Sequence, residues 1–122
     1  MINNMAIDLN DKKLDIKLPL GAPASYWLSL KGYEPAKIAA NLTKPILILQ
    51  GERDYQVTMD DYKGWQDALL KHPNVTFKLY NDLNHLFIEG KGKSTPSEYE
   101  KPGHVNEKVI RDIINWISRF EN

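Results

Sequence analysis

The sequence predicts an α/β fold with parallel strands and flanking helices, and three observations support this prediction. Residues 46–49 are apolar at every position, which is typical of a strand buried on both faces of a parallel sheet. Residues 75–80 form a second expected strand, and helical patterns of apolar residues lie between the two strands and after them. A crossover of this length favours parallel pairing with a right-handed connection. Two strands cannot cover both faces of such a sheet, so we expect an incomplete sheet.

The first 22 residues are expected to form an extended arm or linker. They are polar and weakly periodic, apart from a short alternation of Leu14, Ile16 and Leu18 that indicates at most a small strand. A Gly-Ala-Pro sequence at residues 21–23 interrupts the chain here. Residues 23–122 are therefore expected to form the α/β part of the protein.

Two short helices are expected before the first strand. Residues 24–30 are apolar and aromatic, and Gly32 follows them, which suits the left-handed conformation that often ends a helix. The second helix is expected to begin at Pro35, because the first turn of a helix needs no N–H donor, and to run to Leu42. Pro45 then separates this helix from the first strand.

The helix between the strands has signals at both ends. Thr58 suits the N-cap, and the acidic Asp60 and Asp61 complement the dipole at the start of the helix. We interpret His72 as a residue that complements the opposite end of the dipole, and Pro73 ends the helix. The residues expected to pack on the sheet are Tyr62, Trp65 and Leu69.

The second strand and the segments after it complete the expected order. Residues 75–80 alternate apolar and polar side chains, so this strand is expected to lie nearer the edge of the sheet. Residues 89–103 are rich in Gly, Lys, Ser, Pro and Glu, which predicts a mobile surface loop. The last helix is expected over residues 106–120 and has to bury a wide apolar stripe. The stripe consists of Val109, Ile110, Ile113, Ile114, Ile117 and Phe120.

The composition excludes several classes of partner and site. Sixteen Lys and Arg residues balance 16 Asp and Glu residues, so the net charge gives no reason to expect a nucleic acid or an anionic membrane as partner. No stretch approaches the roughly 18 apolar residues of a membrane-spanning helix. The sequence contains no cysteine, which excludes disulfides, thiolate catalysis and a cysteine-rich zinc site.

Two chemically active side chains follow the two expected strands. Asp54 lies in the loop after the first strand and His85 lies in the loop after the second. Because the carboxyl ends of parallel strands open at one edge of a sheet, we expect these loops to be neighbours. A carboxylate can then accept a hydrogen bond from the imidazole Nδ1–H and leave Nε2 free to take a proton from a nucleophile. The sequence thus predicts two members of a catalytic triad.

A metal site at this edge is not expected. Asp54, Asp82, His85 and Glu89 could supply ligands, but no helical His-x-x-x-His spacing supports that interpretation. His104 lies beside the start of the last helix and is expected to be structural or exposed.

Two segments of the sequence resemble α/β-hydrolases of the bacterial esterase and dienelactone-hydrolase type. Pro45–Val57 is similar to the strand and loop that carry the catalytic acid, and Phe77–Phe87 is similar to the strand and loop that present the catalytic histidine. The superfamily's chain order is serine, then acid, then histidine, and Asp54 and His85 obey the order of the last two. The resemblance covers roughly residues 45–121.

The resemblance implies both a fold and an activity. Residues 23–122 would be the C-terminal part of an α/β-hydrolase domain that acts on small carboxylic esters without a cofactor. Asp54 would be the triad acid and His85 the general base. Residues 19–27 also resemble the segment before the acid-bearing strand, which often shapes the substrate pocket. The side chains expected to bind substrate are Tyr26, Trp27, Tyr55 and Gln56, and core packing is the alternative role of the first two.

The nucleophile of such a triad is missing from this sequence. No Gly-x-Ser-x-Gly motif occurs around the five serines, which are Ser25, Ser29, Ser94, Ser97 and Ser118. We therefore expect a C-terminal fragment of a serine ester hydrolase, with its serine upstream and with no activity of its own.

Two further hypotheses concern assembly. The chain could instead be a non-catalytic α/β module for binding or assembly, in which Asp54 and His85 have no chemical role. In either case, an apolar strand with unpaired edges is expected to pair with a second copy and to give a homodimer.

Overall fold

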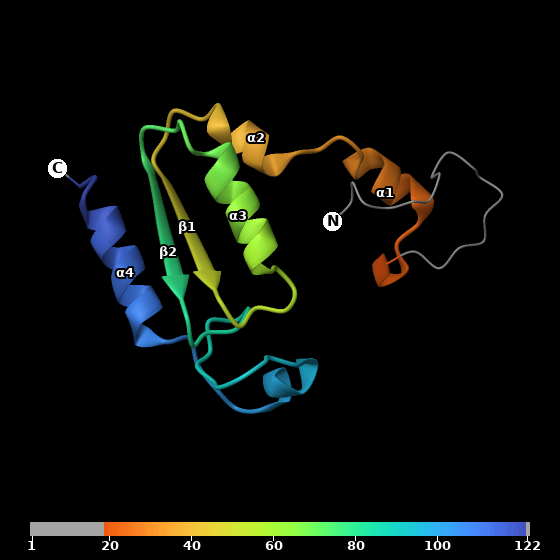
Figure 1. The fold of residues 1–122 in the computed structure, drawn as a ribbon, viewed down its shortest axis with the longest axis vertical. Helices are drawn as coiled ribbons and strands as arrows, with labels where there is room; N and C mark the ends of the chain where they lie inside the picture. The colour runs from red at the N-terminus through yellow and green to blue at the C-terminus, as the bar shows by residue number, and fades with distance from the viewer. Residues whose placement is uncertain (1–18, 122) are drawn as a thin grey trace. The chain divides into compact units, whose positions relative to one another are not determined.

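A computed structural model of the chain describes residues 19–121, which fall into two units with a boundary between Pro35 and Ala36. The first unit contains a 3₁₀ turn, η2 (Pro19–Gly21), and the helix α1 (Ala24–Leu30). The second unit contains the two strands and the helices around them (Figure 1). Most of the arm expected over residues 1–22, including the alternation of Leu14, Ile16 and Leu18, lies outside the described residues.

The helix α1 ends as the sequence predicts. Lys31 is its C-cap, and Gly32 follows in the left-handed region with a φ of 80°. Trp27 is buried, whereas Tyr26 is about half exposed and packs edge-to-face against Trp27. The second short helix, α2 (Pro35–Ala40), begins at the predicted proline and ends two residues before Leu42.

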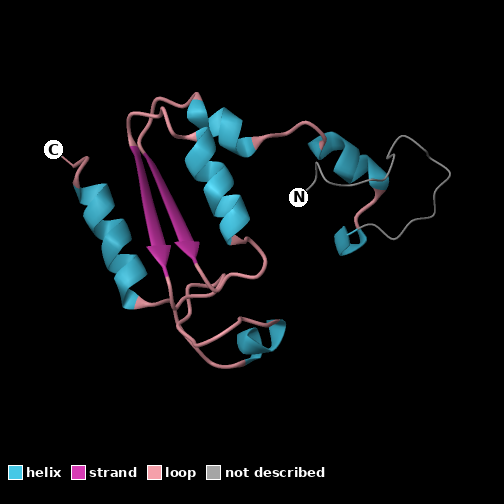
Figure 2. Ribbon diagram, in the orientation of Figure 1, coloured by secondary structure: helices cyan, strands magenta, loops and turns pink. Residues whose placement is uncertain are grey.

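The strands β1 (Ile46–Gly51) and β2 (Val75–Tyr80) form a two-stranded parallel sheet. Their register pairs Ile46 with Val75 and Gly51 with Tyr80, so the strands end side by side. The helix α3 (Met59–Ala68) connects them, and α4 (Glu107–Ser118) follows them (Figure 2). The predicted α/β fold, with parallel strands and flanking helices, is thereby confirmed.

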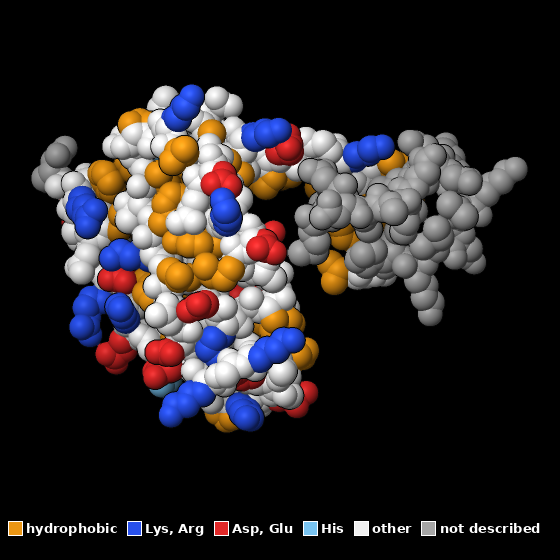
Figure 3. Space-filling model, viewed as in Figure 1, with side chains coloured by type: hydrophobic (Ala, Val, Ile, Leu, Met, Phe, Trp, Pro, Cys, Tyr) orange, Lys and Arg blue, Asp and Glu red, His pale blue; other side chains and the backbone are white. Residues whose placement is uncertain are grey.

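The sheet is incomplete within the described part of the chain. Residues 46–49 of β1, which the sequence predicts to be buried on both faces, are only partly buried. Hydrophobic side chains form a broad exposed patch over the sheet and α3 in the view of Figure 3. Neither outer edge of the sheet is paired among residues 19–121, so pairing with a second copy stays a prediction. No helix of this part of the chain has the length and apolarity to cross a membrane.

The helix α3 is capped at its first turn as predicted. The backbone N–H of Thr58 donates to the Asp61 carboxylate at 3.0 Å, which closes a capping box.

His72 does not complement the helix dipole as predicted. It is buried, and both of its ring nitrogens bind backbone groups. Nδ1 accepts from the Asn74 N–H at 3.1 Å, and Nε2 lies 2.9 Å from the carbonyl of Leu42. The ring thus joins the segment before β1 to the segment before β2.

The helix α4 buries only one side of its apolar stripe. Asn106 caps it by accepting from the Lys108 N–H at 2.9 Å. Val109 packs with Tyr80 and Leu83 in the core, and the Tyr80 hydroxyl donates to Asp112 at 2.8 Å. The prediction that the whole stripe is buried is wrong for the described residues. About half of each side chain is exposed at Ile110, Ile114, Ile117 and Phe120.

Two consecutive leucines at the end of α3 allow a test of this core. Leu69 is completely buried, whereas Leu70 is 81% exposed. We expect Leu69→Ala to lower the free energy of unfolding by about 2–5 kcal/mol, because the change removes buried methyl groups and leaves a cavity. Leu70→Ala is expected to change it by less than about 0.5 kcal/mol. Urea unfolding of the two variants measures this difference, and equal effects would contradict the placement of α3.

Candidate active site

The loops after β1 and β2 are joined by backbone hydrogen bonds at the carboxyl end of the sheet. The N–H of Glu52 donates to the Tyr80 carbonyl at 2.9 Å, and the N–H of Arg53 donates to the Leu83 carbonyl at 3.1 Å. These bonds continue the pairing of the strands beyond their last residues. Asp54 and His85 therefore lie in neighbouring loops at the same end of the sheet.

Gly51 makes this close approach of the two loops possible. A Cβ atom at this position would overlap the backbone carbonyl oxygens of Leu83 and Asn84. The backbone of the second loop therefore lies directly against the last residue of β1. Only glycine leaves room for it, because any other residue would force the two loops apart.

The Asp54 carboxylate is buried and bound at both oxygens. Oδ1 accepts from the backbone N–H groups of Gln56 and Val57, at 2.8 and 2.9 Å. Oδ2 lies 2.8 Å from Nδ1 of His85. The side chain of Asp54 is only 6% exposed. Two backbone donors thus fix the carboxylate and direct its second oxygen at the imidazole.

The His85 ring is bound on one side and open on the other. Its side chain is 39% exposed, and Nδ1 faces Asp54. Nε2 has no hydrogen-bond partner among residues 19–121. A carboxylate on Nδ1 favours the tautomer that carries its proton there, so Nε2 presents a lone pair. This ring can therefore accept a proton from a group placed at its exposed edge.

Asn84 shapes the turn that carries His85, although it is not among the functional residues predicted from the sequence. It is completely buried, and its Oδ1 accepts from the N–H groups of Leu86 and Ile88, at 2.9 and 3.1 Å. Phe87, inside the same turn, has a φ of 58°, a conformation that a bulky residue adopts only when its surroundings enforce it. Asparagine is common in turns of every kind, so the sequence offers no signal that singles this one out.

The segment expected to be a mobile surface loop is anchored instead. It contains a short 3₁₀ helix, η3 (Pro96–Glu100), and Glu89 forms an isolated antiparallel bridge with Leu83. Ser94 is buried and donates to Glu98 at 2.6 Å. The composition of this segment correctly predicts an irregular backbone. It cannot reveal that a partly buried ion pair between Arg53 and Glu98 holds the segment in place.

Glu98 collects three hydrogen bonds on its carboxylate. Arg53 donates to Oε1, while Ser94 and Asn84 donate to Oε2 at 2.6 and 3.1 Å. The bonds from Ser94, Arg53 and Asn84 lower the pKa of Glu98 to about 2, because all of them favour the charged form. The carboxylate is therefore ionised throughout the neutral range.

Two of the four side chains expected to bind substrate lie near Asp54. Tyr55 stacks on Tyr99 of η3 with ring centres 5.9 Å apart, and Gln56 is exposed. Burial and the neighbouring Tyr55 hydroxyl raise the pKa of Tyr99 to about 12. Tyr99 is not among the residues predicted to bind substrate, although an aromatic residue in a polar segment is a recognisable signal. Tyr26 and Trp27 belong to the other unit, so their expected role stays a prediction.

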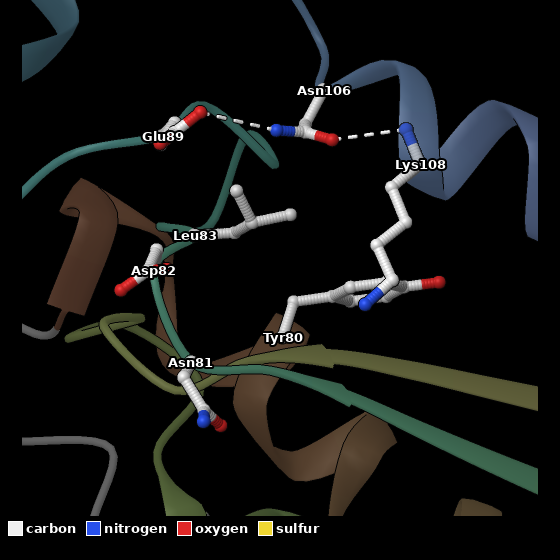
Figure 4. Close-up of a pocket in the computed structure, with 7 residues that line it drawn as sticks. All are labelled: Tyr80, Asn81, Asp82, Leu83, Glu89, Asn106 and Lys108. Carbon is white, nitrogen blue, oxygen red and sulfur yellow. Dashed lines mark hydrogen bonds between the residues drawn. The ribbon is translucent and has the colours of Figure 1, made fainter.

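A small cavity lies beside Leu83 and the start of α4. It has a volume of about 130 Å³ (Figure 4). Asn106 accepts there from the Lys108 N–H and donates to Glu89 at 3.3 Å. The lining residues are Tyr80, Asn81, Asp82, Leu83, Glu89, Asn106 and Lys108. Neither Asp54 nor His85 is among them. Within the described residues, no three His, Asp or Glu side chains form a cluster that could hold a metal ion.

Within the unit that carries His85, none of the three serines, Ser94, Ser97 and Ser118, hydrogen-bonds His85. Ser94 donates to Glu98, and Ser97 pairs with Thr95. Ser29 and Ser118 donate to backbone carbonyls of their own helices. Asp54 and His85 thus form a hydrogen-bonded pair of carboxylate and imidazole, and no serine of the same unit is bonded to it.

Comparison with known proteins gives one family and one relative. A match to the dienelactone hydrolase family covers residues 17–120. Esterase EstD of Thermotoga maritima is 50% identical over 98 residues, which make up 80% of this chain and 24% of the esterase. The chain thus spans about a quarter of the length of that relative. The search of solved structures gave no match.

Proposed function

This chain belongs to the dienelactone hydrolase family of α/β-hydrolases, and we propose that it supplies the triad acid and base of a serine hydrolase acting on carboxylic esters. The observation that carries the proposal is the contact between Asp54 Oδ2 and His85 Nδ1, with Nε2 left open. The relative named as an esterase supports the choice of substrate class.

The proposed chemistry follows from the two ends of the His85 ring. Nε2 takes the proton of a serine hydroxyl as its oxygen bonds to the ester carbonyl carbon, and then gives this proton to the departing alcohol. In the second half of the reaction, a water molecule attacks the acyl-enzyme while Nε2 takes a proton from it. Nε2 then gives this proton to the serine oxygen. Asp54 stabilises the imidazolium at each step, because its carboxylate faces the Nδ1 proton.

We propose that the serine and the oxyanion hole come from a part of the protein that these 122 residues do not include. The Gly-x-Ser-x-Gly motif is absent here, and the chain matches only 24% of the Thermotoga esterase. Tyr55 and Gln56 would border the bound ester, because they follow Asp54 directly. Tyr26 and Trp27 would contribute to the acyl pocket.

A chimaera tests this proposal. The aligned segment of the Thermotoga esterase is replaced by this chain, and the product is treated with a serine-directed fluorophosphonate and assayed with a p-nitrophenyl ester. We expect the chimaera to be labelled and to hydrolyse the ester, because Asp54 and His85 complete the triad of the host. The 122-residue chain alone should stay unlabelled, since it contains no Gly-x-Ser-x-Gly motif.

Two outcomes would contradict the proposal. Labelling of a serine in the isolated chain would show that the nucleophile is among these residues. A folded chimaera that neither reacts with the probe nor cleaves the ester would favour the alternative of a non-catalytic module for binding or assembly. The esterase with the aligned segment deleted serves as the inactive control.

A further inference from the structure

The carboxylate of Glu98 touches the residue before Asp54 and the residue before His85. Arg53 donates to Oε1, and Asn84 donates to Oε2 at 3.1 Å. The two donors come from different loops, and Glu98 belongs to a third segment, the 3₁₀ helix η3. One side chain therefore bridges the loop that carries the carboxylate and the loop that carries the imidazole.

We propose that Glu98 is a positioning residue that holds Asp54 and His85 in register through Arg53 and Asn84. Its effect on ester hydrolysis rests on the function proposed above, whereas its effect on the contact between Asp54 and His85 does not. Glu98 itself reaches neither of them, since its hydrogen bonds go to Arg53, Ser94 and Asn84.

The path from Glu98 to the imidazole runs through a single buried side chain. Asn84 donates to Glu98 with Nδ2, while its Oδ1 accepts from the N–H groups of Leu86 and Ile88. Both N–H groups belong to residues that follow His85 in the same turn. If Asn84 rotates, the turn loses both acceptor bonds at once. Because Asn84 is completely buried, its amide oxygen would lose these partners without water to replace them.

The path to the carboxylate runs through Arg53, whose guanidinium is held on several sides. Its side chain is 7% exposed, and Nε donates to the carbonyl of Gly92 at 2.8 Å. A Cβ on Gly90 would overlap both the Arg53 guanidinium and the Glu98 carboxylate, so the backbone closes tightly over this ion pair. Without Glu98, a buried guanidinium would lose its negative partner, which is costly in a poorly hydrated site.

A carboxylate is required because acceptors are needed on both of its sides. Glu98→Gln keeps the size of the side chain but offers one acceptor in place of two. If the amide oxygen faces Arg53, the amide nitrogen faces the Nδ2 donor of Asn84. We therefore expect Glu98→Gln to disturb the turn at His85 while the rest of the fold is retained. Glu100→Gln is the matched control, because Glu100 lies in the same helix but is exposed.

The readout is the Nδ1 proton of His85, observed by NMR in the 122-residue chain. A proton held between Nδ1 and Asp54 exchanges slowly and gives a downfield resonance, which is assigned by its loss in His85→Ala. We expect Glu98→Gln to abolish or severely broaden this resonance and Glu100→Gln to leave it unchanged. Circular dichroism should show the wild-type content of helix in both variants.

A second substitution provides a rescue that a general loss of stability would not show. In the double variant Asn84→Asp with Glu98→Gln, the amide nitrogen at position 98 can donate to the new carboxylate at position 84. The hydrogen bond is thus reformed in the opposite direction, and the other carboxylate oxygen still accepts from Leu86 and Ile88. We expect the resonance to return in the double variant and to be absent in Asn84→Asp alone, where two carboxylates face each other.

Kinetics of the chimaera separate this proposal from the proposed function. For Glu98→Gln we expect kcat to fall by about 10- to 100-fold with KM changed less than twofold, because misplacement by about 1 Å costs on this order. A wild-type resonance in Glu98→Gln, or a lost resonance that the double variant fails to restore, would overturn the positioning role. The expected NMR pattern combined with an active His85→Ala chimaera would overturn the proposed function alone.

Discussion

Replacing His85 by alanine is expected to lower kcat of the chimaera for a p-nitrophenyl ester by about 10⁴-fold or more, while KM changes little. The loss is large because, in the proposed mechanism, the ring removes the proton of the nucleophile and gives it to the leaving group. Without the ring, the serine hydroxyl has no base within reach. Steady-state kinetics above and below KM measure the two parameters separately.

His104→Ala is the control for this experiment. His104 is an exposed histidine in the segment before α4, so its removal matches the chemical change but not the position. We expect it to leave kcat within about twofold of the unmodified chimaera, in line with other surface substitutions. Equal losses in the two variants, or full activity without His85, would remove this residue from the catalytic machinery.

The order of the elements could be predicted because it depends on local patterns. The uniform apolar run at residues 46–49 and the alternation at residues 75–80 each predict a strand. Parallel pairing then follows from the length of the crossover, and it is this pairing that brings the loops of Asp54 and His85 together. The proximity of Asp54 and His85 could therefore be predicted, because it depends on the strand topology alone.

Contacts between distant segments could not be predicted in the same way. Glu98 lies 45 residues from Arg53 and 14 residues from Asn84, in a segment whose composition indicates a loop and nothing more. His72 was misinterpreted for a related reason, since its partner Leu42 lies 30 residues away. In each case the chemistry of the residue is clear from the sequence, but its partner is set by the tertiary fold.

The exposed stripe of α4 shows another limit of pattern analysis. Helical spacing predicts that Ile110, Ile114 and Ile117 will be buried, but it does not say against which surface. In the described part of the chain, α4 covers β2 with Val109 and leaves these three side chains about half exposed. A hydrophobic period therefore identifies an apolar face of a helix, but it does not determine how much of that face is buried in the described part of the chain.

Gly51→Ala is expected to lower both the stability of the chain and the activity of the chimaera. The added Cβ would overlap the carbonyl oxygens of Leu83 and Asn84, and backbone cannot move aside as a flexible side chain can. We expect the free energy of unfolding to fall by about 1–3 kcal/mol, as for other overpacked sites. We also expect kcat to fall by about 10²-fold, because the loops of Asp54 and His85 are pushed apart.

Gly64→Ala provides a matched control, for which we expect the free energy of unfolding to change in the opposite direction. Gly64 lies within α3, and a Cβ there would meet no atom within 4 Å. Because alanine is the better helix former, this variant should gain about 0.5–1 kcal/mol and keep its kcat. Urea unfolding and ester hydrolysis measured on both variants give the comparison. If Gly51→Ala matched Gly64→Ala in either measurement, the close approach of the two loops, and with it the positioning of His85 against Asp54, would be refuted.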